Sequence, residues 1–375
     1  MIYFDSAATT LQKPPAVARA SAWAIEHLAS PGRGGHLAAR RAAETAYTCR
    51  KLAAELFEVD DPQRVVLTFN ATHGLNLAIK TLVKSGMTVL ISGYEHNAVT
   101  RPLSAIPGVN VKVAAGPLFC PEKFMEEFRR QLTQEVDAVV CTHVSNVFGY
   151  ILPVEQVADL CRDKGIPLII DASQSAGCLP LSMAGTGAAF IAMPGHKGLY
   201  GPQGTGLLLC SGPAEPLLQG GTGSESMKQT MPAFLPDRLE AGTHNIAGAA
   251  GLVEGLRFVL ARGPEKIGRQ EQELTAQLGE GLSQIPDIEV FRDRIGDAQT
   301  GVISFRAEGR DCEELCERLG DMGCAMRAGL HCAPLAHRTA GTLDTGTIRA
   351  STSVFNTRWE VEQLLLAVRR VLKEK

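Results

Sequence analysis

Strongly apolar runs alternate with helix-forming segments along much of the chain, and this alternation limits the fold more than any other feature. Segments 64–82, 87–99 and 138–171 each pass between a β-branched run and a helical or turn-forming stretch. Such runs are typical of buried strands, and strands that alternate with helices favour right-handed crossovers. We therefore predict an α/β protein with a doubly wound sheet.

The chain is long enough for one large and one smaller domain. It has 375 residues, of which 45% are hydrophobic, so a sizeable core is expected. Beyond about Gly263, segments 287–293 and 300–306 have strand patterns, segment 311–323 has a helical one, and a Thr357–Glu360 capping box opens the last helix. We predict an N-terminal segment at 1–15 packed with the small domain, a large domain at 16–258 and a small α+β C-terminal domain at 259–375.

The charge balance gives no reason to expect a nucleic-acid or membrane partner. Lys and Arg total 37, Asp and Glu 40, and the net charge is −3. No apolar run approaches the ~18 residues of a membrane span, and the N-terminus lacks a basic-then-apolar secretion signal, so we expect a cytoplasmic protein. In the reducing cytoplasm, the ten cysteines are expected to be free thiols rather than disulfides. The spacing of Cys312, Cys316, Cys324 and Cys332 matches no zinc pattern, so no metal is expected.

A single lysine, Lys197, stands between glycines in segment 192–206, just after an apolar run. A lysine held in a tight turn at the end of a buried strand is restrained and partly dehydrated, which lowers its pKa and makes its amine a nucleophile toward carbonyls. These are the requirements of a Schiff-base lysine. A surface lysine in a Gly/Pro loop is the alternative.

An acid-ended strand lies about 25 residues upstream of that lysine. Segment 166–177 is a β-branched run that ends in Asp171, with Gln174 three residues later. Ligands of open α/β sheets bind at the carboxyl ends of strands, and in enzymes that use pyridoxal 5'-phosphate (PLP) such an aspartate keeps the pyridine nitrogen protonated. A helix cap is the alternative for Asp171 alone. The pair of strand ends favours a PLP site.

Four ordered motifs resemble the cysteine desulfurase and selenocysteine lyase family, of the class V aminotransferase type. They are EHNAV at Glu95, IIDASQSAG at Ile169, PGHKGLYGPQGTG at Pro194 and RAGLHCAPLAH at Arg327. The resemblance extends from YFDSAATT near the N-terminus to IRASTSVFNT near the C-terminus, so it covers nearly the whole chain. It implies PLP-dependent transferase fold type I, with a mostly parallel seven-stranded sheet flanked by helices.

The resemblance also implies a set of cofactor contacts. Thr72 is the first phosphate ligand that the residues themselves predict, because segment 70–72 opens a helix whose free N–H groups favour an anion. With the family's other positions, the implied PLP-binding residues are Ala71, Thr72, His96, Asn146, Asp171, Gln174, His196 and Lys197. Ordinary alternatives stay open for Thr72 as a helix N-cap, for His96 as a satisfied core histidine and for Asn146 as a turn residue.

Three further expectations concern a second subunit and the phosphate. By resemblance, Thr243 contacts the phosphate of the other subunit's cofactor, which makes a homodimer necessary, and Arg33 and His36 approach the neighbouring active site. A loop threonine and a helix-entry loop are the alternatives. Relatives usually carry Ser or Thr where this chain has Pro194, which offers neither hydroxyl nor N–H, so we expect weaker cofactor retention.

The implied reaction converts L-cysteine to L-alanine. Lys197 holds PLP and then removes the Cα proton, His96 stacks on the ring and moves a proton, and Cys332 attacks the substrate sulfur to form a persulfide. Arg349 binds the substrate carboxylate, with Asn146, Arg327 and His331 as further substrate contacts. A surface ion pair for Arg349 and a structural cysteine for Cys332 are the alternatives.

Other functions stay open from the sequence alone. A selenocysteine lyase that releases selenide and L-alanine is the nearest, followed by an aminotransferase or epimerase of the same fold. A non-catalytic PLP-binding or sulfur-carrier protein is the alternative from another class. A sulfur-acceptor protein is an expected partner, but no motif identifies it.

Overall fold

A seven-stranded sheet is the centre of the computed structural model, which describes residues 1–32, 34–294 and 297–373. All neighbouring strands are parallel except that β8 runs antiparallel to both of its neighbours. The prediction of a mostly parallel seven-stranded sheet is therefore confirmed. In spatial order the strands are β2 (Val65–Thr68), β8 (Gly206–Cys210), β7 (Phe190–Pro194), β6 (Leu168–Asp171), β5 (Ala138–Thr142), β3 (Thr88–Ser92) and β4 (Asn110–Ala114).

Both faces of this sheet are buried under helices, which explains why its strands are apolar throughout. Within β5, Val139 and Cys141 pack into the core on one face, while Ala138 and Val140 pack into the core on the other. The first face is covered by α2 (Leu37–Phe57), α5 (Pro121–Gln131), α6 (Val154–Lys164) and α8 (Ile246–Arg262), and the second by α3 (Ala71–Leu82) and α4 (Asn97–Ser104). Helix α1 (Pro15–His27) packs along α8, and η1 (Pro62–Arg64) and α7 (Met183–Thr186) are short.

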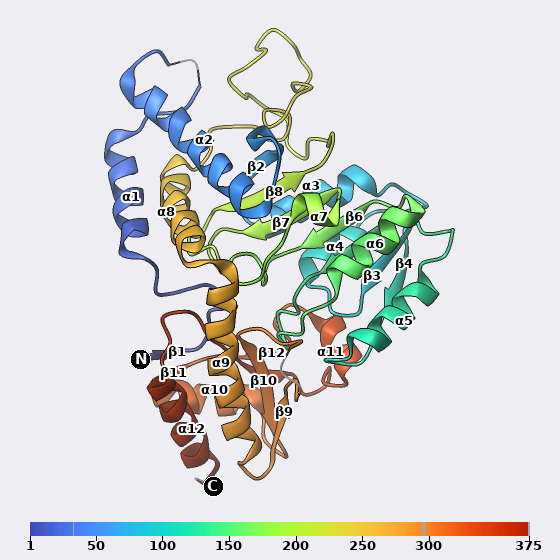
Figure 1. Cartoon of the computed structure of the whole chain (residues 1–375), viewed down its shortest axis with the longest axis vertical. Coiled ribbons are helices and arrows are strands. Elements are labelled where there is room, and N and C mark those ends of the chain that lie inside the picture. The colour runs from blue at the N-terminus through green and yellow to red at the C-terminus, as the bar shows by residue number, and fades with distance from the viewer. Residues whose placement is uncertain (33, 295–296, 374–375) are drawn as a thin grey trace.

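Residues 264–373 form what we call the C-terminal unit, drawn at the bottom of Figure 1. Its four-stranded antiparallel sheet has the order β12 (Arg327–Gly329), β13 (Thr347–Ser351), β10 (Val302–Ala307) and β9 (Ile288–Phe291). Helices α9 (Pro264–Ser283), α10 (Cys312–Asp321) and α12 (Arg358–Lys373) share one core with it, and α11 (Pro334–Ala340) follows β12. Thr357 and Glu360 form the predicted capping box ahead of α12.

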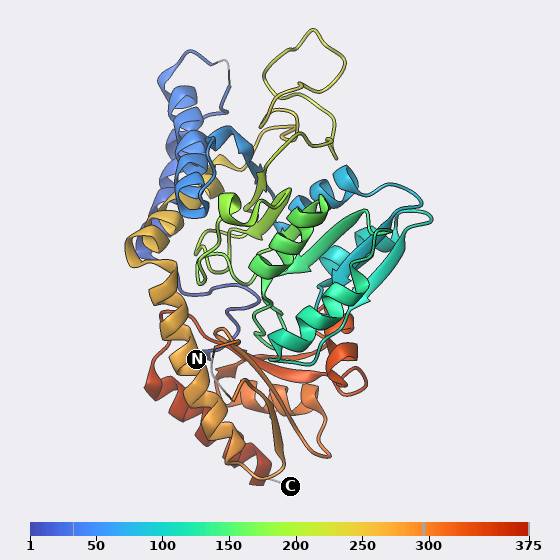
Figure 2. The ribbon, with the colours of Figure 1, turned by 45° about the vertical axis from the view of Figure 1, so that its right-hand side comes forward.

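The N-terminal segment joins the two parts of the molecule. Strand β1 (Ile2–Tyr3) pairs in parallel with β11 (Cys324–Ala325), and Phe4 lies in the core of the C-terminal unit. Six residues after Phe4, the backbone N–H of Thr10 donates to the carbonyl of His196, 3.1 Å away, beside the large sheet. Figure 2 shows this segment running between the sheets. The predicted boundaries at residues 15 and 258 stay predictions.

The topology sets one edge of the large sheet apart. The loops that leave β2, β3, β5, β6 and β7 all emerge at the carboxyl ends of these parallel strands, so residues distant in sequence meet there. Helices α8 and α9 carry the chain from the large sheet to the C-terminal unit (Figure 1). Within the described ranges, no helix is long and apolar enough to cross a bilayer.

Candidate active site

A cavity of about 100 Å³ lies at this carboxyl edge and brings together side chains from five strand ends. Lys197 and His196 follow β7, and Asp171 ends β6. The other predicted site residues that line it are Ala71, Thr72, His96, Asn146 and Gln174, and Pro194 lines it as well. The strand-end positions read from the sequence therefore converge in space.

The turn that carries Lys197 is tightly packed. The Gly195 N–H donates to the Thr205 carbonyl (2.8 Å), and the Tyr200 N–H donates to the carbonyl of Lys197 (2.9 Å). A Cβ on Gly198 would lie only 2.3 Å from the carbonyl oxygen of Ala176, so glycine is required after the lysine. Burial lowers the pKa of Lys197 to about 8, although the nearby Asp171 carboxylate opposes this shift. At physiological pH a much larger fraction of this amine is therefore neutral than of an ordinary lysine amine, although the protonated form still predominates.

Asp171 is buried at the end of β6, and its two carboxylate oxygens differ in their surroundings. The backbone N–H and the hydroxyl of Ser173 both donate to Oδ1. Within the described part of the chain, Oδ2 has no hydrogen-bond partner. An acceptor is therefore left for a protonated ring nitrogen in the cavity.

His96 begins helix α4 rather than lying free in a loop. Its Nδ1 accepts a hydrogen bond from the Ala98 N–H at 3.0 Å, which leaves the proton of the neutral ring on Nε2. Burial lowers the pKa of His96, so the ring is neutral near pH 7. A neutral ring with one fixed nitrogen is suited to stacking and to proton transfer at the other nitrogen.

The N-terminus of α3 opens onto the same cavity. Asn70 is its N-cap and accepts from the His73 N–H (2.9 Å), so the alternative of Thr72 as the N-cap is wrong. Ala71 and Thr72 occupy the first two helical positions, and their backbone N–H groups have no acceptor among the residues that the structure describes. Two free donors at a helix N-terminus suit a phosphate.

The loop that carries Cys332 is held against the large sheet by hydrogen bonds from that side. The Asn146 side-chain amide donates to the carbonyl of His331 (2.8 Å), and the Asn97 N–H donates to the carbonyl of Cys332 (2.8 Å). His331 and Cys332 have φ values of 50° and 57°, a conformation that non-glycine residues rarely adopt and that recurs at functional sites. Cys332 alone among the ten cysteines is exposed.

His331 itself is buried and uncharged. Its Nε2 lies 3.1 Å from the carbonyl oxygen of Thr347, so this nitrogen carries the proton. Burial and the neighbouring Arg349 guanidinium lower the pKa of His331 to about 2. The Nδ1 atom has no partner among the described residues and remains a bare acceptor beside the cysteine.

The two predicted substrate arginines share a carboxylate that the sequence reading did not single out. Arg327 Nη2 lies 2.9 Å from Asp5 Oδ2, and Arg349 Nη2 lies 3.2 Å from Asp5 Oδ1. Arg349 also donates from Nη1 to the carbonyl of Asn146 (2.7 Å), while its buried Nε has no partner in the described chain. The surface ion pair considered for Arg349 is wrong, because its side chain is only 3% exposed.

Some predicted residues lie outside this cavity. Thr243 is exposed and does not line it, although Glu240, at the base of the same loop, is fixed by an ion pair with Arg50 (2.6 Å). His36 is the N-cap of α2 and accepts from the Ala39 N–H, and Arg33 lies outside the described residues. No cluster of three or more His, Cys, Asp or Glu side chains that could hold a metal occurs in the described ranges.

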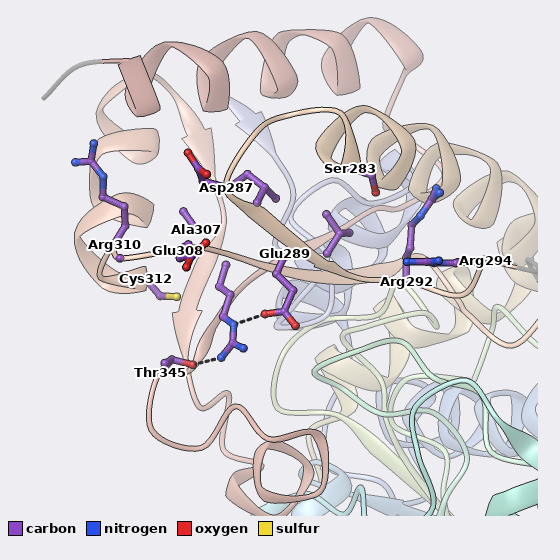
Figure 3. Close-up of a pocket in the computed structure, with 14 residues that line it drawn as sticks. Ser283, Asp287, Glu289, Arg292, Arg294, Ala307, Glu308, Arg310, Cys312 and Thr345 are labelled. Carbon is purple, nitrogen blue, oxygen red and sulfur yellow. Dashed lines mark hydrogen bonds and ion pairs between the residues drawn. The ribbon is translucent and has the colours of Figure 1, made fainter.

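A pocket larger than this cavity lies elsewhere in the described structure. It has a volume of about 990 Å³ and lies in the C-terminal unit beside strand β9 (Figure 3). Arg306 there bonds to Glu289 and to Thr345. Arg292, Arg294 and Arg310 line the same pocket (Figure 3). It includes none of the predicted site residues, so size does not identify the active site here.

Two buried carboxyl groups give the protein a predicted pH dependence. Glu95 precedes His96, Glu271 lines a small cavity behind Lys197, and burial raises the pKa of each to about 8. Above the unfolded value of 4.5, the folded state therefore holds protons that the unfolded state has lost. We expect the free energy of unfolding to fall as pH rises from about 4.5 to about 8, by up to about 1.4 kcal/mol per pH unit for each group.

Urea unfolding at pH 5 and pH 8 measures this slope. Glu271→Gln should flatten it, whereas Glu273→Gln, which alters an exposed carboxylate on the same helix, should leave it unchanged. An equal slope in the Glu271 variant and the unaltered protein would contradict the assignment of a neutral carboxyl at this position.

Comparison with known proteins agrees with the resemblance read from the motifs. A family model described as Aminotransferase class-V matches residues 2–364. The chain is 30% identical over 389 residues to a probable cysteine desulfurase of Pyrococcus abyssi, covering 100% of this chain and 94% of the relative. It is 32% identical over 390 residues to a probable cysteine desulfurase of Mycolicibacterium paratuberculosis, covering 99% of this chain but 55% of that longer protein.

A solved structure extends the agreement to the fold. The apo structure of the cysteine desulfurase from Thermococcus onnurineus superposes with a TM-score of 0.90 at 30% identity, covering 100% of this chain and 95% of the other. The chain therefore belongs to the class V aminotransferase family and, within it, to the cysteine desulfurase family.

Proposed function

We propose that this protein is a PLP-dependent cysteine desulfurase that converts L-cysteine to L-alanine and retains the sulfur as a persulfide on Cys332. One observation carries the proposal: a partly buried lysine of lowered pKa shares a cavity with an aspartate, while an exposed cysteine lies near enough to influence that pKa. The family membership supports the same reaction. The selenocysteine, transamination and epimerisation alternatives have no observation that favours them.

The described residues fit PLP. The unpartnered Oδ2 of Asp171 suits a protonated ring nitrogen, and the free N–H groups of Ala71 and Thr72 suit the phosphate, with the Thr72 hydroxyl and His196 as further contacts. Lys197 would carry the cofactor, His96 would stack on its ring, and Asn146 and Gln174 would contact its edge. When bound, PLP supplies an electron sink for the substrate Cα.

The chain's own groups account for the remaining chemistry. Arg349 binds the substrate carboxylate through its open Nε, and the Lys197 amine accepts the Cα proton. The Cys332 thiolate then attacks the substrate sulfur. An S–S bond forms as the Cβ–S bond breaks, and the electron pair of the broken bond stays with Cβ, which is protonated to give alanine. The exposure of Cys332 supports a sulfur-acceptor protein as the next partner.

We also infer a homodimer and a cytoplasmic location. Large apolar side chains are exposed on α1 and α2, including Trp23, Ile25 and Tyr47, and a second copy would cover such a surface. Thr243 lies outside the cavity of its own chain, which is compatible with a contact to the partner's phosphate. All ten cysteines are free, which supports a reducing compartment.

The purified, PLP-loaded protein tests the proposed function directly. It should form alanine from L-cysteine but not from D-cysteine, and the peptide containing Cys332 should gain the mass of one sulfur atom. Alanine and selenide from L-selenocysteine, with no turnover of L-cysteine, would replace the proposal with selenocysteine lyase. Release of pyruvate or of D-amino acid would contradict both.

Pro194 provides a prediction about cofactor retention. It lines the cavity at the end of β7 and can donate no hydrogen bond, so Pro194→Ser should add a donor to the phosphate. The half-time of PLP loss during dialysis against a PLP scavenger should lengthen by about 10- to 100-fold, the effect of one hydrogen bond to a charged group. Pro202→Ser controls for the loss of a nearby proline outside the cavity. Equal half-times for the Pro194 variant and the unaltered protein would contradict the prediction.

A further inference from the structure

Asp5 joins two arginines that lie directly opposite each other in the sheet of the C-terminal unit. Arg327 in β12 and Arg349 in β13 are register partners. Like charges at such positions repel and weaken the pairing of two strands. Strand β12 has three residues and lies at the sheet edge, so within the sheet it pairs with β13 alone. A negative charge between the two guanidinium groups is therefore needed to offset their repulsion.

The Asp5 carboxylate serves both guanidinium groups. Its Oδ2 lies 2.9 Å from Arg327 Nη2, and its Oδ1 lies 3.2 Å from Arg349 Nη2. The Arg349 side chain is 3% exposed and that of Asp5 12% exposed, so an unpaired Arg349 would be a costly buried charge. Two cations and one anion leave a net positive charge for one further carboxylate.

The backbone fixes where this carboxylate lies. The Ser351 N–H donates to the carbonyl of Phe4 (2.7 Å), and the Ala7 N–H donates to the Ser351 hydroxyl (2.8 Å). Asp5 itself forms a parallel bridge with Ser351, two residues beyond Arg349. A short side chain on a backbone anchored beside β13 is a rigid support for the guanidinium.

Strand β12 also connects Asp5 to the loop that carries Cys332. Strand β12 ends at Gly329, and the chain then enters the loop of Cys332. Asn146 and Asn97 hold the far side of that loop, whereas β12 holds its near side. We propose that Asp5 is a positioning residue that neutralises the Arg327–Arg349 pair and so sets both the carboxylate-binding guanidinium and the start of the Cys332 loop. Only the carboxylate part rests on the proposed function.

Hydrogen–deuterium exchange without substrate tests the structural part. In Asp5→Asn, which keeps the side-chain shape and removes the charge, the backbone amides of β12 and of its partner β13 should exchange faster than in the unaltered protein. Glu289→Gln is the matched control, because Glu289 pairs with the directly opposite Arg306 in β9 and β10 of the same sheet. Unchanged exchange in Asp5→Asn would overturn the inference.

A double variant separates neutralisation from a merely structural role of Asp5. If repulsion loosens β12, Asp5→Asn combined with Arg327→Gln removes the repelling partner and should restore the protection of β12, the strand that carries Arg327. A double variant that exchanges as fast as Asp5→Asn alone would overturn the inference. Should Asp5→Asn not accumulate as folded protein, the double variant carries the test, because loss of the repelling guanidinium should raise its yield of folded protein above that of Asp5→Asn, and an equal yield would overturn the inference.

Binding of L-alanine tests the positioning of Arg349. Alanine carries the carboxylate but no sulfur, and its affinity can be titrated through the visible absorbance of bound PLP. Asp5→Asn should weaken it about 10- to 100-fold, whereas Glu289→Gln should not change it. Equal affinities in Asp5→Asn and the unaltered protein would overturn this part. A protein that makes no alanine from L-cysteine contradicts the proposed function and leaves the exchange experiments intact.

Discussion

Lys197→Ala is expected to abolish covalent retention of PLP and to lower the rate of alanine formation from L-cysteine by at least about 10³-fold. The variant loses both the amine that holds the cofactor and the general base, and a positioned base alone contributes about 10²- to 10⁴-fold. Borohydride reduction of the unaltered protein should leave a pyridoxyl mass on the peptide that contains Lys197. The variant should show no such mass on any peptide.

A second lysine supplies the matched control. Burial also lowers the pKa of Lys13 to about 8, so the pKa does not distinguish the two amines. Geometry does. The Lys13 amine donates to the Thr10 hydroxyl at 2.7 Å and does not line the cavity that contains Asp171. Lys13→Met should therefore keep the pyridoxyl mass on Lys197, and a label found on Lys13 instead would contradict the proposed site.

The sequence predicted those parts of the molecule that depend on local pattern. Apolar runs such as 138–142 must be buried on both faces, and a sheet of parallel strands brings their carboxyl ends to one edge. The meeting of Asp171 and Lys197 in one cavity follows from this rule, because Asp171 ends β6 and Lys197 lies in the turn that follows the adjacent strand β7. Glycine spacing around the lysine was likewise readable, since Gly198 has no room for a side chain.

Other features depend on contacts between distant segments and carry no local signal. Asp5 lies more than 300 residues from both arginines that it pairs with, in a segment that reads only as small and polar. The protonation states of Glu95 and Glu271 depend on their burial. Burial is not expected from the sequence, because glutamate is rarely buried. For Asn70, the N-cap signal was available in the sequence, but Thr72 also fitted it. A search for buried cations that lack a local partner would have pointed toward an acid such as Asp5.

Cys332→Ser is expected to leave PLP binding intact while alanine formation from L-cysteine falls to background. Serine has nearly the same shape, so the backbone that holds residues 331 and 332 at positive φ should persist. What disappears is the attacking sulfur, and without it the substrate Cβ–S bond has no acceptor for its sulfur. Mass spectrometry should accordingly find no added sulfur on the variant's peptide, and L-cysteine should still change the visible absorbance of the bound PLP.

Cys120→Ser provides the control for this experiment, because Cys120 is a partly exposed thiol without a place in the site. Its alanine formation and its persulfide on Cys332 should match those of the unaltered protein. Alanine formation that survives in Cys332→Ser would remove the cysteine from the nucleophile role. Alanine formation by Cys332→Ser from L-selenocysteine alone would have a different meaning, because selenium leaves carbon more readily than sulfur does. Cys332 would then be needed to break the carbon–sulfur bond, but not for the cofactor chemistry that precedes this step.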